Sequence, residues 1–276
     1  MSITASQVNE LRKKTGAGMM DCKKALVEAD GDMEAAIDLL RKKGQKVAAK
    51  RGDNETNEGL VIAKTLDGNK KGVILALACE TDFVAKNDDY YKLVDSLVDV
   101  AARNNSGSLE EFLSSQYDDS LSVGDKIIEQ TGVIGEKLEV TQLGVIDAEA
   151  VVAYNHPGNQ IASLIGLTKE GETAMEAGRQ VAMQVAAMAP IALNKDEVDQ
   201  ATIDRELEIG KDLAIQEGKP AEMAEQISKG RLNKFFKENT LLSQAFIKDN
   251  KKSVEQFLNE TEDGLTVKAF KRVALK

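Results

Sequence analysis

The sequence predicts an α+β protein in which a three-helix bundle precedes two similar units, each a strand hairpin followed by a helix. Three observations predict this class. Apolar residues recur at helical spacing in residues 1–51, and Thr15-Gly16-Ala17-Gly18 and Asp30-Gly31 interrupt them. The segments 60–79 and 150–167 each carry two β-rich runs joined by a turn. An amphipathic helix pattern follows each of these segments.

The bundle is expected to begin at a capping box, with Thr4 as the cap and Gln7 reaching back to its backbone. Met19–Ala29 is expected as the second helix. Asp32 is expected to cap the third helix, with Gly44 following its last turn.

Six cations crowd into residues 41–51 behind this third helix. One interpretation is contact with RNA or an acidic partner. The other is a solvated helix end and linker, where cations suit the negative end of the helix dipole. No aromatic residue that could stack on a base lies among them.

In the first unit, the strands are expected at Leu60–Leu66 and Val73–Cys79, with a hairpin turn between them. Every position of 73–78 is apolar, which is typical of a strand buried on both faces. Asn87 is expected to cap a helix that ends near Arg103. Residues 81–86 therefore form a turn between a rigid strand and a rigid helix.

In the second unit, strands are expected at Ala150–Tyr154 and Ile161–Leu167, followed by a helix from Glu172 to Met188. Further strands are expected at Lys137–Val145 and Val267–Leu275. Domain boundaries are predicted from these patterns, and they divide the chain into residues 1–54, 55–146 and 147–276.

A helical hairpin is expected within the second unit at about residues 196–237. Ile203, Leu207 and Leu213 mark one helix face, and Pro220 is expected at the first position of the return helix. Gly210 allows two antiparallel helices to pack closely.

Composition excludes several classes of function. The net charge of −10 over 276 residues argues against general affinity for nucleic acid or anionic lipid. No apolar run is long enough to span a bilayer, and the first six residues have no signal or transit pattern, so a cytoplasmic location is expected.

No chemistry-bearing motif is present in the sequence. Cys22, Cys79 and His156 are the only residues of their kinds, and their spacing does not suit a metal site. No phosphate-binding loop or nucleophile motif occurs. We therefore expect no catalytic residue, no metal and no cofactor, and a protein that is not an enzyme.

The turn after the apolar strand contains Asp82 and Phe83. By physical reasoning alone, a Phe beside a strand end belongs to the core, and Asp82 is an ordinary turn residue or cap. The motifs around these two residues favour a different interpretation.

Thr81-Asp82-Phe83-Val84-Ala85-Lys86 behind an apolar strand resembles the signature of the bacterial elongation factor Ts family, the exchange factors for elongation factor Tu. Leu11–Leu26 resembles the N-terminal signature of that family. The resemblance continues through residues 230–236 and 243–246, so it covers essentially the whole chain. One departure is that the family commonly has Glu and Asn where this chain has Ala76 and Ala78.

The resemblance implies a ubiquitin-associated type of three-helix module at residues 1–54. It also implies that the helical hairpin is a coiled-coil arm, which touches the partner or a second copy. A surface hairpin that only stabilises its own unit is the alternative. Whether the chain forms a homodimer or a two-to-two complex with its partner stays open.

The resemblance also implies the partner-binding residues. Thr81, Asp82, Phe83 and Val84 would disturb the Mg²⁺ site of elongation factor Tu. The N-terminal module would add a second contact through Leu11, Arg12, Met19 and Met20, although both methionines also suit the bundle core. His156 matches a family position that meets the partner, and the alternative is an exposed loop residue.

The predicted function is therefore guanine nucleotide exchange. Phe83 would enter an apolar pocket of the GTPase, and Asp82 would perturb the surroundings of Mg²⁺. The alternative function is a ribosome- or nascent-chain-associated binding protein that uses the N-terminal bundle.

Overall fold

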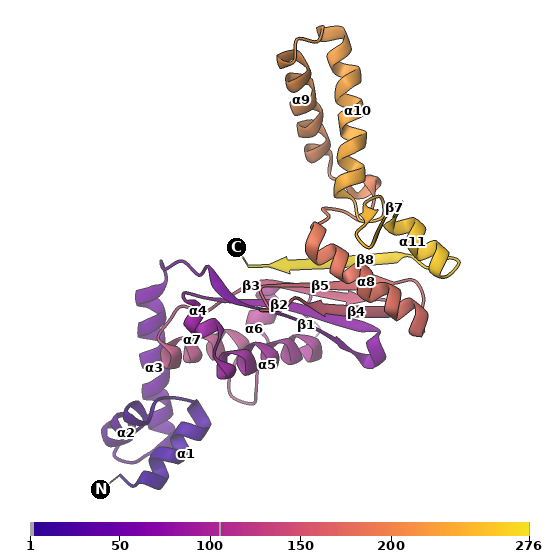
Figure 1. Ribbon diagram of the computed structural model, residues 1–276. Helices are drawn as coiled ribbons and strands as arrows, with labels where there is room; N and C mark the ends of the chain where they lie inside the picture. Colours follow the sequence, from indigo (N-terminus) through magenta and orange to yellow (C-terminus); the bar gives the residue numbers. More distant parts are fainter. Residues whose placement is uncertain (1–2, 105, 276) are drawn as a thin grey trace.

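The computed structural model describes residues 3–104 and 106–275. Figure 1 shows a small helical bundle at one end, a layered centre, and a helical hairpin projecting at the other end. The helices are α1 Ala5–Thr15, α2 Met19–Glu28, α3 Met33–Arg51, α4 Asp82–Ala85, α5 Asp88–Asn104, α6 Leu109–Ser114, α7 Val123–Ile134, α8 Glu172–Met188, α9 Gln200–Gln216, α10 Ala221–Asn239 and α11 Val254–Thr261. The strands are β1 Glu58–Leu66, β2 Lys71–Cys79, β3 Glu139–Asp147, β4 Ala150–Asn155, β5 Ile161–Leu167, β6 Ala245–Phe246, β7 Asp249–Ser253 and β8 Val267–Ala274.

The centre consists of four layers, helix on sheet on sheet on helix. Two antiparallel sheets, β1-β2-β3 and β4-β5-β8, pack face to face through apolar side chains such as Ile74 and Leu164. Helix α5 covers the outer face of the first sheet and α8 that of the second (Figure 1). This mixed architecture confirms the predicted α+β class.

Strand β2 is buried on both faces, as predicted. Val73, Leu75 and Leu77 face the α5 side, while Ile74 and Ala76 face the second sheet. The Tyr90 hydroxyl of α5 donates to the Leu77 carbonyl at 2.8 Å. The strand is therefore held from both sides, and it offers a rigid base for the turn that follows it.

The outer edge of β1 is covered by the end of β4 and by the turn that follows it. The Asn155 side chain accepts from the Ala63 backbone N–H at 2.8 Å and donates to the Ala63 carbonyl at 2.9 Å. The Asn155 amide takes the place of a neighbouring strand at this point, because it pairs with a backbone donor and a backbone acceptor that the edge of β1 would otherwise leave unpaired.

The prediction that the third helix ends before Gly44 is wrong. Helix α3 runs for 19 residues to Arg51, so the cations of residues 41–51 lie on a helix rather than on a linker. Gly44 is buried because α7 crosses α3 at this point, with Gly132 against it. Helix α7 was not predicted, and neither were α6, α11, β6, β7 and the four-residue helix α4, which lies where only a turn was expected.

The helical hairpin is present as α9 and α10 and lies apart from the layered centre in Figure 1. Gly210 lies close to Ser228, whose hydroxyl donates to the Leu207 carbonyl at 2.6 Å. Pro220 is the cap of α10 rather than its first residue, since its ψ of 144° is not helical. Within the described ranges, every helix is too short or too polar to cross a lipid bilayer.

Candidate partner-binding site

Phe83 projects from the surface of the molecule. It lies on α4, a single helical turn between β2 and α5, and its side chain is 84% exposed. The next residue, Val84, packs against the core beneath α5. The burial of Phe83 that physical reasoning alone predicts is therefore wrong, because Val84 occupies the inward direction of this short helix.

The backbone around Phe83 is closed by local hydrogen bonds. The Lys86 N–H donates to the Asp82 carbonyl at 3.0 Å, and the Asn87 N–H donates to the Val84 carbonyl at 3.0 Å. The Asn87 side chain accepts from the Asp89 N–H at 2.8 Å, as expected for the cap of α5. The turn therefore passes directly from one rigid element to the next.

Asp82 is paired with Lys86, whose ammonium lies 2.6 Å from its carboxylate. This hydrogen bond holds the pKa of Asp82 below its ordinary value, so the carboxylate is ionised at neutral pH. Both side chains reach into solvent. Within residues 3–104 and 106–275, no cluster of three His, Cys, Asp or Glu side chains could hold a metal ion.

Glu80, the residue after β2, joins three segments. Its carboxylate accepts from Arg51 of α3 at 2.7 Å, from the Asn54 side chain at 2.9 Å and from the Lys137 backbone N–H at 2.6 Å. Partial burial opposes ionisation, yet these three hydrogen bonds hold the pKa of Glu80 below its ordinary value. No local pattern around Glu80 indicates this role, since its hydrogen-bond partners come from distant segments.

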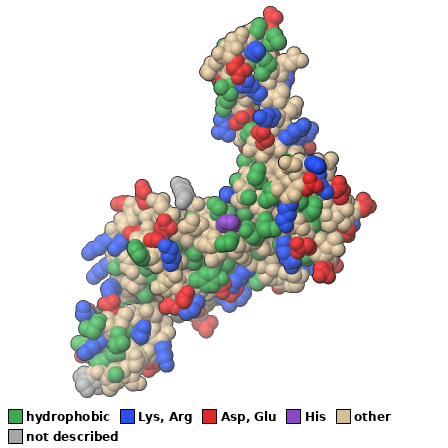
Figure 2. All heavy atoms as spheres, viewed as in Figure 1, with side chains coloured by type: hydrophobic (Ala, Val, Ile, Leu, Met, Phe, Trp, Pro, Cys, Tyr) green, Lys and Arg blue, Asp and Glu red, His purple; other side chains and the backbone are tan. Residues whose placement is uncertain are grey.

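The predicted N-terminal contact residues divide into two groups. Met19 and Met20 at the start of α2 are 57% and 64% exposed, and Arg12 is also exposed. Leu11 is wholly buried among α1, α2 and α3, so its side chain cannot contact a partner in this conformation. The structure assigns Leu11 to the bundle core because it faces the other two helices. Figure 2 shows hydrophobic side chains at the surface of this end of the molecule.

His156 is exposed in the turn between β4 and β5 (purple in Figure 2). The Tyr154 hydroxyl lies 3.0 Å from its Nδ1. The turn is held by backbone hydrogen bonds, including one from the Asn159 N–H to the His156 carbonyl at 2.9 Å. His156 thus has a defined position beside the second sheet, whereas Phe83 lies on the helix that follows β2 of the first sheet.

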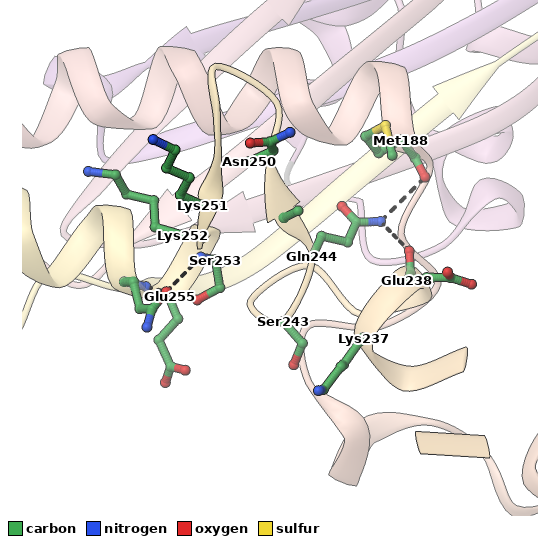
Figure 3. Close-up of a pocket in the computed structure, with 12 residues that line it drawn as sticks. Met188, Lys237, Glu238, Ser243, Gln244, Asn250, Lys251, Lys252, Ser253 and Glu255 are labelled. Atoms are coloured by element: carbon green, nitrogen blue, oxygen red, sulfur yellow. Dashed lines mark hydrogen bonds between the residues drawn. The ribbon is translucent and has the colours of Figure 1, made fainter. Parts of the chain in front are cut away.

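A surface pocket of about 670 Å³ lies elsewhere, at the base of the helical hairpin. In Figure 3, Gln244 points between the ends of α8 and α10 and donates to the carbonyls of Met188 and Glu238. Gln184 donates to its side-chain oxygen at 3.1 Å. These contacts hold the hairpin base together, and none of the predicted partner-binding residues lines the pocket.

Comparison with known proteins agrees with the motifs of the sequence. The model of the family described as Elongation factor TS matches residues 80–276. The chain is 56% identical over 273 residues to Elongation factor Ts of Christiangramia forsetii, covering 99% of this chain and 98% of the relative. The chain belongs to the elongation factor Ts family. It is an elongation factor of protein biosynthesis.

Two other elongation factor Ts proteins are each 50% identical, those of Flavobacterium psychrophilum over 274 residues and Cytophaga hutchinsonii over 275 residues. Each alignment covers 99% of both chains. The similarity therefore extends over the N-terminal bundle as well as over residues 80–276.

Ala76 and Ala78, the two positions at which the sequence departs from the expected pattern, are both wholly buried in β2. A side chain at either position is enclosed by neighbouring strands, so neither residue meets a partner directly. Both residues therefore belong to the interior of the sheet rather than to the surface that carries Phe83.

Proposed function

We propose that this chain is a guanine nucleotide exchange factor that binds GDP-loaded elongation factor Tu and promotes release of GDP, so that GTP can bind. Membership of the elongation factor Ts family supports this role. The observation that carries the proposal is the 84% exposure of Phe83 on a short helix between two rigid elements.

A GTPase holds its nucleotide through backbone amides around the phosphates and through Mg²⁺. A factor that releases GDP must bind the empty GTPase more tightly than the loaded one, and GDP then weakens the factor by the same ratio. The exposed Phe83 ring supplies such a differential contact when it enters a pocket that opens only in the empty form. Complete burial of a Phe side chain is worth about 1.5–3 kcal/mol.

Asp82 supplies the second part of the proposed mechanism. Its carboxylate is ionised at neutral pH and lies beside Phe83, so insertion of the ring carries a negative charge toward the Mg²⁺ and phosphate site of the GTPase. This charge would draw on the metal or on the donors that hold the phosphates. Thr81 and Val84 act with them by setting the direction of the helix turn.

Additional contacts make the interface specific. We assign Met19, Met20 and Arg12 to a second contact, because flexible methionine side chains adapt to an apolar partner surface. His156 is assigned to a third contact on the β4–β5 turn. Insertion of Phe83 then adds to binding that the other surfaces have already established.

The test is stopped-flow release of fluorescent GDP from elongation factor Tu, with the native protein and a Phe83→Ala variant. Loss of a central aromatic anchor is expected to slow release about thirtyfold. Ile247→Ala is the control, since Ile247 is a 47% exposed apolar residue in the β6–β7 turn. Native protein that binds without accelerating release would overturn the function, and a fully active Phe83→Ala variant would overturn the site.

A further inference from the structure

The carboxylate of Glu136 receives three hydrogen bonds from the residues that lead into α4. Its Oε2 accepts from the backbone N–H groups of Glu80 at 3.2 Å and Thr81 at 3.0 Å. Its Oε1 accepts from the Thr81 hydroxyl at 2.6 Å. Glu136 lies between α7 and β3, 55 residues from Thr81 in the sequence.

Glu80 makes the reciprocal contact. Its carboxylate accepts from the backbone N–H of Lys137, the neighbour of Glu136, at 2.6 Å. The segments 80–81 and 136–137 therefore lie side by side, and each one presents a carboxylate to the backbone N–H groups of the other. We call Glu80 and Glu136 together the carboxylate brace.

Helix α4 depends on support from outside itself. It has only four residues, and an isolated turn of helix is unstable because its ordering costs more than its few hydrogen bonds return. The Thr81 hydroxyl does not cap α4, since it donates to Glu136 instead. The contacts of Glu136 thus set the direction in which the chain leaves β2.

We propose that Glu136 is a positioning residue for nucleotide exchange, holding Thr81 so that Phe83 is presented in a fixed orientation to the GTPase. The inference rests on the proposed function, and it adds a residue outside both motifs of the sequence. Glu136 acts through Thr81 rather than by touching the partner itself.

The carboxylate brace also reaches the N-terminal bundle. Arg51 in the last turn of α3 donates to both oxygens of Glu80, at 3.0 and 2.7 Å. The turn that carries Phe83 and the helix that carries the bundle therefore share one anchoring group. Both proposed contact regions are in this way held relative to the same end of β2.

The test measures GDP release as a function of factor concentration for the native protein, Glu136→Ala and Glu136→Gln. For Glu136→Ala we expect the limiting rate of GDP release to fall about tenfold. The variant must order the backbone of roughly one residue when it binds, and the entropic cost of that ordering corresponds to about this factor in rate. The half-saturating concentration should change less than about twofold, because the other contacts are intact.

Glu136→Gln is expected to restore the limiting rate to within about twofold of native. Its amide oxygen can accept the two backbone N–H groups, while its NH₂ donates to the Thr81 hydroxyl, which can also accept. Glu149→Ala is the control, because Glu149 is an exposed glutamate between β3 and β4. Should Glu136→Ala not fold, Glu136→Asp takes its place, since its shorter side chain withdraws the carboxylate.

Amide hydrogen exchange of the free protein gives a readout independent of GDP. Glu136→Ala should abolish protection of the Thr81 N–H, while protection of the Leu75 N–H in β2 stays native. The proposal would be overturned if Glu136→Ala left the protection of the Thr81 N–H unchanged or kept the native limiting rate. It would also be overturned if the variant changed only the half-saturating concentration. If the native protein does not accelerate GDP release from elongation factor Tu, the proposed function fails. The amide hydrogen exchange measurement alone then decides whether Glu136 orders the turn.

Discussion

Gly132 of α7 lies directly against Gly44 of α3, and a Cβ built on Gly132 would come within 2.4 Å of the Gly44 Cα. Such a distance is not tolerated between carbon atoms, so the two backbones touch where the helices cross. This contact joins the N-terminal bundle to the layered centre. It also explains why a glycine lies inside α3, because a side chain at residue 44 would collide with the backbone of α7.

Gly132→Ala should lower the free energy of unfolding by about 1–3 kcal/mol, because the added methyl forces two backbones apart. Gly230→Ala is the matched control, since Gly230 lies inside α10 with nothing within 4 Å of a Cβ. That change should stabilise the protein by about 0.5–1 kcal/mol through helix propensity. Urea unfolding of both variants measures the difference, and equal stability would contradict the close crossing.

Replacing both Met19 and Met20 by Ser should raise the half-saturating concentration for GDP release about tenfold while the limiting rate is retained. Their side chains are exposed, so the free energy of unfolding should not change. Met188→Ser, at an exposed methionine at the end of α8, serves as the control. If the double variant kept the native half-saturating concentration, the proposed contact through the N-terminal bundle would be wrong.

Neither thiol should react with Ellman's reagent in the native protein at pH 8. Burial raises the pKa of Cys79 to about 11, and burial also raises the pKa of Cys22. The reagent requires an accessible thiolate, and both cysteines are wholly buried. Both should react at once in concentrated urea. Rapid reaction of either thiol without denaturant would show that its surroundings open readily.

Glu80→Gln should lower the free energy of unfolding at pH 7 by about 1 kcal/mol, because Arg51 and the Lys137 N–H lose an ionised acceptor. The pKa of Glu80 is below its ordinary 4.5 in the folded state, so the stabilisation is fully present above pH 4.5. It is lost as the pH falls through the lower folded-state pKa.

The measurement is urea unfolding of native protein and Glu80→Gln at several pH values from 7 to 3. The stability difference between them should shrink as the pH falls below 4.5. Glu149→Gln is the control, and it should leave the free energy of unfolding at pH 7 unchanged, since Glu149 is exposed. If the stability difference between native protein and Glu80→Gln grew toward low pH, it would contradict a Glu80 carboxylate that is stabilised in its ionised form.

Elements with strong local patterns were predicted closely. The helix Glu172–Met188 and the strand Ile161–Leu167 have the predicted bounds, because apolar periodicity and flanking turn residues mark their ends. Helix α7 was not predicted, since Gly124, Thr131 and Gly132 weaken its helical pattern. It is stabilised by packing on α3, which no local window contains.

The candidate site shows the same division. The motif around Asp82 and Phe83 pointed to the turn, and family resemblance pointed to its role. Leu11 illustrates the limit, because a residue within a signature can belong to the core rather than to the surface. Nothing near Glu136 in the sequence indicated that its carboxylate would receive the backbone of Thr81.

The sequence by itself determined the α+β class, the doubly buried strand 73–78 and the family to which the chain belongs, since each is carried by motifs or patterns of consecutive residues. Only the tertiary structure decided that Phe83 faces solvent and that Glu136 supports its turn. The physical reason is that exposure depends on what packs beneath a residue. Here Val84 packs on the core, and a carboxylate 55 residues from Thr81 holds the entry to α4.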